Sequence, residues 1–275
     1  MRTGKKTPAW VYTVFGLLFS AIMLFPLYWI INVSLTKPAD LVSIPPHLFP
    51  ADPTLEGYRL AFEKNLHPLL VSLGLATSSV VLCLAISLPA AYGMSKLKAP
   101  GTGIIMFGFL LSQMVPGIVV VTALFTLYKN VGLLNTLPGL VLADGTIAVP
   151  FATILLQAFM RTLPNELFEA ARIDGAGRLR TFWSIAIPLS RNAVVTAGLF
   201  AFLFAWGDFL NAKTLTTGNS VVPITLALFR FVGAEATNWN AVMATAVLAS
   251  VPAALLLVFA QKYVAAGVTA GAVKD

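Results

Sequence analysis

The sequence predicts an all-α, polytopic membrane protein with six transmembrane helices and both termini in the cytoplasm. The first observation is composition: 58% of the 275 residues are apolar and only 11% are charged, whereas a soluble domain carries roughly 25% charged residues. The second is a series of long uncharged runs, and the third is the placement of lysine and arginine between them. The net charge of +7 does not indicate nucleic-acid binding, because the basic residues lie in short segments between apolar runs.

Six apolar runs are candidates for membrane-spanning helices, which need about 20 apolar residues. They cover residues 10–33, 68–92, 103–128, 137–160, 192–210 and 239–259. The first run is longer than the roughly 7–15 residues of a secretory signal core, so we interpret it as a retained helix. The fifth run has only sixteen uncharged residues between Arg191 and Asp208. Such a helix covers roughly 24 Å of an apolar layer of about 30 Å, so we expect protein to shield its ends.

Two of these runs contain residues that interrupt a helix. Pro116-Gly117 lies in the middle of the third run, and Asp144-Gly145 and Pro150 interrupt the fourth. Interrupted backbone in lipid is tolerated only where protein or a cavity satisfies its polar groups. The break in the third run therefore indicates either a helix that faces a pathway or a simple packing kink.

Two long connections are expected outside the cytoplasm. Residues 34–66 are rich in proline, which predicts an exposed loop with one short helix near 55–64. Residues 212–238 predict a second sizeable loop.

The orientation follows from the basic residues. If the N-terminus is cytoplasmic, the inner segments hold twelve lysines and arginines and the outer segments hold six. Because cytoplasmic loops of membrane proteins carry the excess of these residues, both ends are predicted to lie inside.

Residues 161–191 form a polar segment in this otherwise apolar chain. Pro164 suits the first turn of a helix that extends to Asp174, and glycines then permit a reversal. A second short helix is predicted over 178–187, with Pro188 as its stop. The adjacent alanines 170 and 171 predict a flat face that a partner can approach closely. The alternative interpretation is an ordinary amphipathic segment at the membrane surface.

The spacing of the polar segment carries a resemblance to a known family. Glu169-Ala170-Ala171, three further residues, Gly175, nine residues and then an I-x-x-P sequence resemble the signature loop of permease subunits of binding-protein-dependent ABC importers. The likeness is to the carbohydrate-uptake branch, and within it to the smaller maltose-importer permease subunits. It extends over most of the chain, through residues 34–38, 50–58, 89–92, 100–101, 114–117, 132–136, 163–167, 206–209 and 267–274.

The resemblance implies a type I ABC importer permease fold and a set of roles. A core over 67–264, with a coupling loop at 162–190, would follow an N-terminal helix and outward loop over 1–66 and precede a cytoplasmic tail over 265–275. The residues implied to dock on an ATPase subunit are Glu169, Ala170, Ala171, Asp174 and Gly175. The polar and aromatic candidates for the substrate pathway are Gln113, Asn135 and Trp206.

The same resemblance implies the partners and the location. The permease would sit in the cell inner or plasma membrane with a second, homologous permease, two ATPase subunits and an extracytoplasmic solute-binding protein. ATP and magnesium would be bound by the ATPase subunits, and no cofactor, metal or catalytic residue is expected in this chain. The expected cargo is a sugar or a sugar-like polar solute such as a glycerophosphodiester.

Other functional classes are less well supported. No G-x-x-x-x-G-K-[ST] phosphate loop and no nucleophile–base pattern occurs, so the chain is not expected to be an enzyme. The main alternative is a secondary transporter driven by an ion gradient, a class that commonly buries acids at mid-membrane. Here the candidate acids, Asp144 and Asp208, fall near predicted outer ends of helices. Neither this alternative nor a scaffold protein explains the polar segment.

Overall fold

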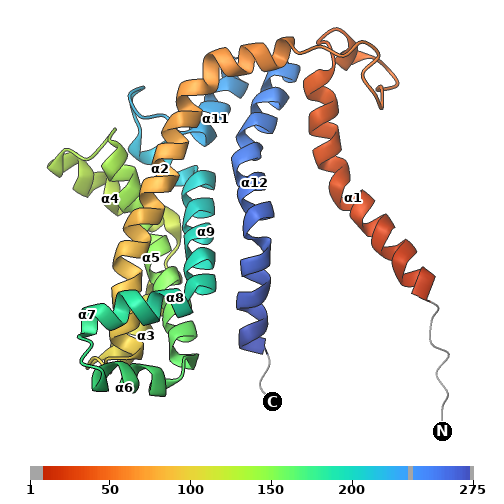
Figure 1. Cartoon of the computed structure of the whole chain (residues 1–275). Coiled ribbons are helices and arrows are strands. Elements are labelled where there is room, and N and C mark those ends of the chain that lie inside the picture. The colour runs from red at the N-terminus through yellow and green to blue at the C-terminus, as the bar shows by residue number, and fades with distance from the viewer. Residues whose placement is uncertain (1–8, 235–237, 273–275) are drawn as a thin grey trace. The chain divides into compact units, whose positions relative to one another are not determined.

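The structure is a computed structural model that describes residues 9–234 and 238–272, and every regular element in these ranges is helical (Figure 1). The longest helices are α1 (Ala9–Leu35), α2 (Glu56–Ser95), α5 (Leu137–Thr162) and α12 (Trp239–Ala272). Those of intermediate length are α3 (Thr102–Gln113), α4 (Gly117–Val131), α9 (Arg191–Gly207) and α11 (Ile224–Ala234). The short elements are η1 (Asp40–Val42), α6 (Asn165–Ile173), α7 (Arg178–Thr181), the π-helical turn η2 (Phe182–Ala186), α8 (Ile187–Leu189) and α10 (Leu210–Leu215). The predicted all-α class is confirmed.

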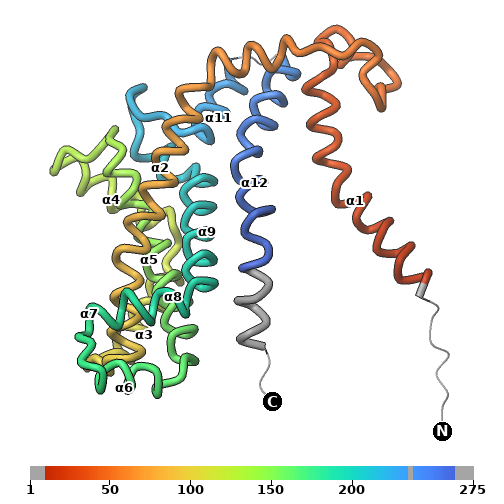
Figure 2. The backbone as a smooth tube through the Cα atoms, in the orientation of Figure 1, coloured from red at the N-terminus to blue at the C-terminus, as the bar shows by residue number. Residues whose placement is uncertain are grey.

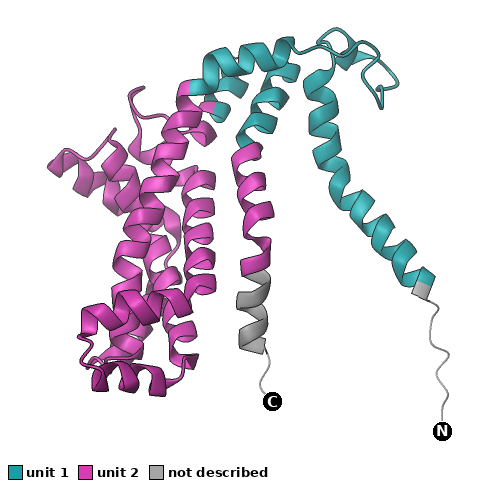
Figure 3. Cartoon of the chain, viewed as in Figure 1, with its two compact units in different colours: residues 1–66, 228–250 teal, residues 67–227, 251–275 magenta. Residues whose placement is uncertain are grey.

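The chain divides into two compact units (Figure 3). Unit 1 contains residues 1–66 and 228–250, and unit 2 contains residues 67–227 and 251–275. Three helices, α2, α11 and α12, each contribute to both units. The division into 1–66, 67–264 and 265–275 stays a prediction. The basic start at 1–8 and the last three residues of the tail, 273–275, lie outside the described residues.

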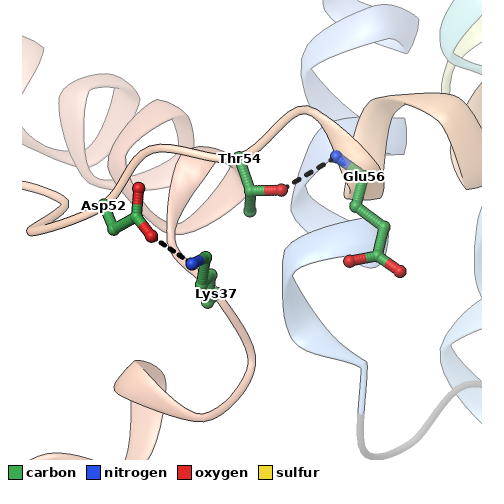
Figure 4. A network of polar contacts seen from close by, with 4 residues as sticks. All are labelled: Lys37, Asp52, Thr54 and Glu56. Carbon is green, nitrogen blue, oxygen red and sulfur yellow. Dashed lines mark hydrogen bonds and ion pairs between the residues drawn. The ribbon is translucent and has the colours of Figure 1, made fainter.

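In unit 1, polar contacts fasten the proline-rich loop between α1 and α2. Lys37 forms an ion pair with Asp52, and the Thr54 hydroxyl accepts the backbone N–H of Glu56 at 3.2 Å (Figure 4). The Thr54 N–H in turn donates to Leu35 O at 2.9 Å. These contacts tie the end of α1 to the start of α2, where a side-chain oxygen satisfies a backbone donor that a helix leaves free.

The membrane character of unit 1 is clearest in α1. Phe15, Leu18 and Ile22 are each more than half exposed, and the most apolar stretch of this helix has no buried residue. A helix that is apolar all round is typical of a membrane span. The start of α12 instead packs closely on α2, since a side chain at Gly57 would meet backbone atoms of Asn240 at 3.0 Å.

The core of unit 2 is built on α5 and α9, which run side by side (Figure 2). Small residues make this approach possible. Four buried alanines recur every four residues on α9, at positions 193, 197, 201 and 205, and α5 contributes the buried Ala148 and Ala152 to the same core. Small side chains at such spacing let helix backbones come close together in membrane proteins.

Four helices are long and apolar enough to cross a membrane, and two bent helix pairs raise the number to six if each pair is one span. The first pair is α3 and α4, which meet at 98° at the predicted Pro116 break. The second is the α7–α8 segment with α9, bent by 80°. The break at Pro116 is therefore confirmed, whereas the count of six spans and the orientation stay predictions.

Two predicted helix boundaries in the apolar runs are wrong. The short helix near 55–64 and the second span are one continuous helix, α2, which passes through Pro68. Helix α5 likewise continues through Asp144-Gly145 and Pro150. Gly145 serves close packing, because a side chain there would meet Leu82 Cδ2 at 3.2 Å. Prolines within membrane helices are tolerated where neighbouring groups compensate for the lost backbone bond.

Two predictions outside the apolar runs also need correction. Residues 212–238 are not a plain loop, because they contain the end of α10 and the whole of α11. The helix that begins at Arg178 does not stop at Pro188 but continues to Leu189. The π-helical turn η2 lies just before this proline, and such a turn alters the backbone bonding pattern that a proline would otherwise disrupt.

Candidate functional site

The polar segment between α5 and α9 begins with the predicted short helix, now defined as α6. Pro164 precedes its first residue with φ −58° and ψ 131°, the extended conformation of a residue that caps a helix. Glu166 lies in the first turn and Arg172 in the last turn. Each charge is therefore at the end of the helix where the backbone dipole stabilises it.

A glycine turn ends α6 and reverses the chain. Gly175 has φ +76°, its N–H donates to Arg172 O at 3.0 Å, and the N–H of Ala176 donates to Ala171 O at 2.8 Å. This pair of bonds is the Schellman motif. A side chain at Gly175 would meet nothing within 4 Å, so the glycine supplies a left-handed backbone conformation and not space. The turn positions α7 to follow α6 directly.

One face of α6 is anchored to α2 through Phe168. This side chain is 5% exposed, its ring centroid lies 6.3 Å from that of Tyr92, and Tyr92 also packs against Phe182 at 5.2 Å. The Lys96 Nζ lies 4.9 Å from the centre of the Phe168 ring, within the range of a cation–π contact. Phe168 therefore fixes α6 against the end of the membrane-spanning helix α2.

Lys96 also holds the entry to α6. Its Nζ donates to Leu163 O at 2.6 Å and to Asn165 Oδ1 at 3.0 Å. Burial lowers the pKa of Lys96 below its usual value of 10.5, while the nearby Glu166 carboxylate opposes that shift. The ammonium group is therefore partly shielded from water where it holds the start of α6.

The opposite face of α6 is open. Glu169, Ala170 and Asp174 are exposed, whereas Ala171 is 7% exposed. Ala171 lies three residues from Phe168, and residues at this spacing share a helix face. Of the two alanines predicted to form a flat face, Ala170 is exposed and Ala171 is mostly buried.

A groove of about 500 Å³ lies between α6 and the α7–α8 segment. Its walls include Ala170 and Ala171 of α6, Asp174 just after that helix, and Arg180, Ser184 and Pro188 from the other side. Large apolar side chains are also exposed on the helices that form it, with Ile173 86%, Leu179 71% and Trp183 61% exposed. An apolar surface of this kind on a polar segment marks a contact surface. Because the family resemblance implies a coupling role for this stretch, we call residues 164–189 the coupling segment.

The three pathway candidates do not gather in one place. Gln113 is exposed at the end of α3, and its Nε2 donates to Ile147 O of α5 at 3.1 Å. Trp206 is 6% exposed and stacks on Phe202 with ring centroids 5.6 Å apart. Asn135 has φ +60°, a conformation that asparagine tolerates better than most residues.

The Asn135 side chain fastens the loop after α10. Its Oδ1 accepts the N–H of Gly218 at 2.7 Å, and its Nδ2 donates to Thr217 Oγ1 at 3.0 Å. The backbone N–H of Asn135 also donates to Leu215 O at 3.1 Å. In this structure Asn135 therefore joins the start of α5 to the connection between α10 and α11.

Sequence reasoning missed a buried polar cluster formed by Asp144 of α5 with Asp208 and Asn211 around α10. Asp144 is 4% exposed, and its Oδ1 accepts Asn211 Nδ2 at 3.0 Å. The Asp208 carboxylate accepts the backbone N–H groups of Asn211 and Ala212 at 3.3 and 3.0 Å, which caps α10. The sequence signal was that Asp144 and Asp208 are each a lone charge in a long uncharged stretch.

The buried polar cluster borders a cavity of about 470 Å³. Its apolar walls include Ile147, Leu203, Phe204 and Leu210. Because Gln113 bonds to the backbone of Ile147, this pathway candidate lies beside the cavity. A cavity with apolar walls and a few polar groups is the usual form of a small-molecule site.

Within the described residues, no three His, Cys, Asp or Glu side chains are grouped as a metal site would require.

Comparison with known proteins identifies the class. Residues 83–270 match the family of binding-protein-dependent transport system inner membrane components. The chain is 33% identical over 267 residues to the trehalose transport system permease protein SugB of Mycobacterium tuberculosis (strain CDC 1551 / Oshkosh), covering 96% of this chain and 97% of SugB. It is also 33% identical to the trehalose/maltose transport system permease protein MalG of Thermococcus litoralis, covering 94% of each.

Solved structures have the same fold. A bacterial ABC transporter that imports the acidic polysaccharide alginate contains a chain with a TM-score of 0.79, at 23% identity, over 92% of this chain and 95% of that one. A second alginate transporter structure, in complex with an alginate-pentasaccharide-bound periplasmic protein, gives a TM-score of 0.66 at 14% identity, over 90% of this chain and 92% of that one. The fold is therefore that of type I ABC permeases, and the protein is a multi-pass membrane protein.

The composition, the fold and the extent of these matches lead to one conclusion: the chain belongs to the family of inner membrane components of binding-protein-dependent transport systems.

Proposed function

We propose that the protein is a permease subunit of an ATP-driven ABC importer and forms half of the translocation pathway for a sugar or sugar-like solute. The observation that carries the proposal is the family match over residues 83–270, together with the presence of the signature spacing on one ordered segment. The relatives named for trehalose and for trehalose/maltose transport support the sugar class. These relatives are transport permeases, and we assign no catalytic step to this chain.

The coupling segment is proposed to dock on an ATPase subunit. Its buried face is fixed to α2 by Phe168 and Lys96, so a force on the open face would pass to a membrane-spanning helix. The open face offers the Glu169 carboxylate, Ala170, and the groove with Asp174. The turn at Gly175 determines the direction in which α7 leaves α6, and therefore how the two walls of the groove face each other.

The complete importer is proposed to contain a second, homologous permease, two ATPase subunits and an extracytoplasmic solute-binding protein. The alginate transporter structure, which contains a periplasmic protein, supports the proposal of a binding protein. ATP and magnesium would be held by the ATPase subunits. The protein would lie in the inner or plasma membrane with both termini in the cytoplasm. The coupling segment would then lie on the cytoplasmic side, where ATP is available.

Part of the solute pathway is proposed to pass Gln113 and the neighbouring cavity beside the buried polar cluster. Carboxylate and amide groups suit the hydroxyls of a sugar, and Phe204 offers an apolar face to its ring. Asn135 and Trp206 stay predictions as pathway residues.

The first experiment is capture of the tagged full-length chain from its native membrane in a mild detergent, with identification of the co-purifying proteins. A nucleotide-binding subunit and a second permease are the expected companions. Recovery of the chain alone, with no binding when an ATPase subunit is supplied, would reject the importer and make a transporter driven by an ion gradient the leading alternative.

The coupling role is tested by Glu169→Lys, which reverses the charge on the open face. We expect ATP-dependent uptake and ATPase capture to fall at least about tenfold, because a charge that faces a partner changes sign, while the chain stays in the membrane. The matched control is Glu63→Lys, an exposed acid that pairs with Arg59 at 3.8 Å on the surface of unit 1. Unchanged uptake by Glu169→Lys would refute the docking assignment.

A further inference from the structure

A second pocket, of about 550 Å³, lies where the turn between α2 and α3 meets the last turns of α5. Its walls include Ser95, Lys98, Gly103, Met106, Gln157 and Arg161. Its volume is in the range of small-molecule sites. It is separate from the coupling groove and from the cavity beside the buried polar cluster.

The pocket is positively charged. Lys98 and Arg161 both line it, and no acidic side chain does. Within the part of the chain that the structure describes, neither cation forms an ion pair. Two unpaired cations on one concave surface favour an anionic ligand, and the arginine fork matches the geometry of a phosphate.

The side chain of Gln157 adds a polar amide to the wall of the pocket. Its side chain is 5% exposed and lines the pocket, yet within the described ranges its amide has no hydrogen-bond partner. Its polar atoms are not sealed from solvent, so they are open to a molecule that enters the pocket. The Gln157 amide can donate two hydrogen bonds to an oxygen-rich group in the pocket.

The start of α3 adds backbone donors. Gly101 precedes this twelve-residue helix, no side chain caps it, and Gly103 of the first turn lines the pocket. The first N–H groups of a helix have no partner inside the helix and favour anions.

The pocket also lies at one end of α2 and α5, two helices that are long and apolar enough to cross a membrane. Ser95 is the last residue of α2, Arg161 is next to the last residue of α5, and the turn into α3 lines the same pocket. Helix α3 lines the pocket with Gly103 and Met106 and presents an apolar track on the neighbouring face. Ile104, Phe107 and Leu111 are 80%, 60% and 47% exposed and follow one another at helical spacing.

We propose that this pocket binds the phosphate headgroup of an anionic phospholipid, with Lys98, Arg161 and Gln157 as its polar contacts. The acyl chains would cover the α3 track. A free phosphate ion has no acyl chains and would leave these apolar residues uncovered. Basic pockets between membrane helices on the cytoplasmic side are suited to such lipids. The assignment does not depend on which solute the protein carries.

The test uses the full-length chain in an uncharged detergent, with lipid binding followed by native mass spectrometry. Phosphatidylglycerol is titrated against phosphatidylcholine, and we expect the anionic lipid to bind preferentially. The double variant Lys98→Gln/Arg161→Gln should bind phosphatidylglycerol about tenfold more weakly. The matched control, Lys129→Gln/Arg59→Gln, removes the same charges elsewhere and should bind it as the unchanged chain does.

Three outcomes would overturn the proposal. These are equal binding of the two lipids, equal weakening by the control variant, or displacement of phosphatidylglycerol by an equal concentration of inorganic phosphate, which would indicate a free-anion site. If the double variant does not fold, Gln157→Glu takes its place. It keeps the side-chain size and puts a negative charge in the pocket, so phosphatidylglycerol binding should fall, and unchanged binding would reject the site.

Discussion

The coupling segment and the buried polar cluster are both polar regions of one membrane-embedded unit, but they are built in different ways. The coupling segment is one continuous stretch in which a cap, a helix and a glycine turn follow in order. The buried polar cluster joins Asp144 to Asn211, which are 67 residues apart in the sequence. The first region depends on local backbone chemistry and the second on the packing of distant helices. They should therefore respond differently to substitution.

The largest effect is expected in the buried polar cluster. Asn211→Leu removes the donor to Asp144 Oδ1 and leaves a buried carboxylate oxygen without this partner. We expect a loss of about 3 kcal/mol in the free energy of unfolding, because a buried polar pair is strongly weakened when one member is removed. The measurement is denaturant unfolding of the purified chain in detergent.

A double-variant cycle sharpens this prediction. Asp144→Leu/Asn211→Leu replaces both partners by apolar groups, which is often close to neutral. The double variant should therefore be more stable than Asn211→Leu alone. If the two single losses simply add, the contact does not couple the two residues, and the contrast with the coupling segment fails.

A smaller effect is expected at the glycine turn of the coupling segment. Gly175→Ala places a side chain at φ +76°, which costs about 1 kcal/mol, although no atom lies close enough to clash. Gly177 is the matched control, since its φ is −67° and it also has open space around it. We expect Gly175→Ala, and not Gly177→Ala, to weaken ATPase capture. Equal effects of the two variants would show that backbone conformation does not set the groove.

The smallest effect concerns Lys96 and pH. Because burial lowers its pKa, the unfolded chain holds more protons than the folded chain between that lowered pKa and 10.5. Stability should therefore rise as pH rises through this window. The difference in unfolding midpoint between the unchanged chain and Lys96→Met should grow in favour of the unchanged chain toward pH 10.5. Parallel pH profiles would contradict this role for the Lys96 environment.

The sequence predicted the parts of the fold that rest on local signals. The apolar runs located the helices, Pro116 marked the bend of 98°, and Pro164 and Gly175 marked the limits of α6. Each of these residues acts through its own backbone conformation, so a single chain is enough to interpret it.

Predictions were wrong where a distant contact overrides a local tendency. Glycine often interrupts a helix, but Gly145 lies inside α5, where Leu82 packs against it. Ala171 is more buried than its neighbour Ala170, because it shares a helix face with Phe168, which packs on Tyr92 of α2. The partner of Asp144 could not be inferred, because the choice of Asn211 depends on how α10 folds back toward α5.

The alanine ladder on α9 has a consequence for how the sequence can vary through evolution. Positions 193, 197, 201 and 205 face the core at between 0% and 3% exposure. At such positions any larger side chain would push the two backbones apart, so acceptable replacements narrow to glycine, alanine and serine. Phe204, on the same helix but 42% exposed, faces no such limit. Amino-acid substitutions along α9 should therefore be restricted at every fourth residue and more freely accepted at the positions between.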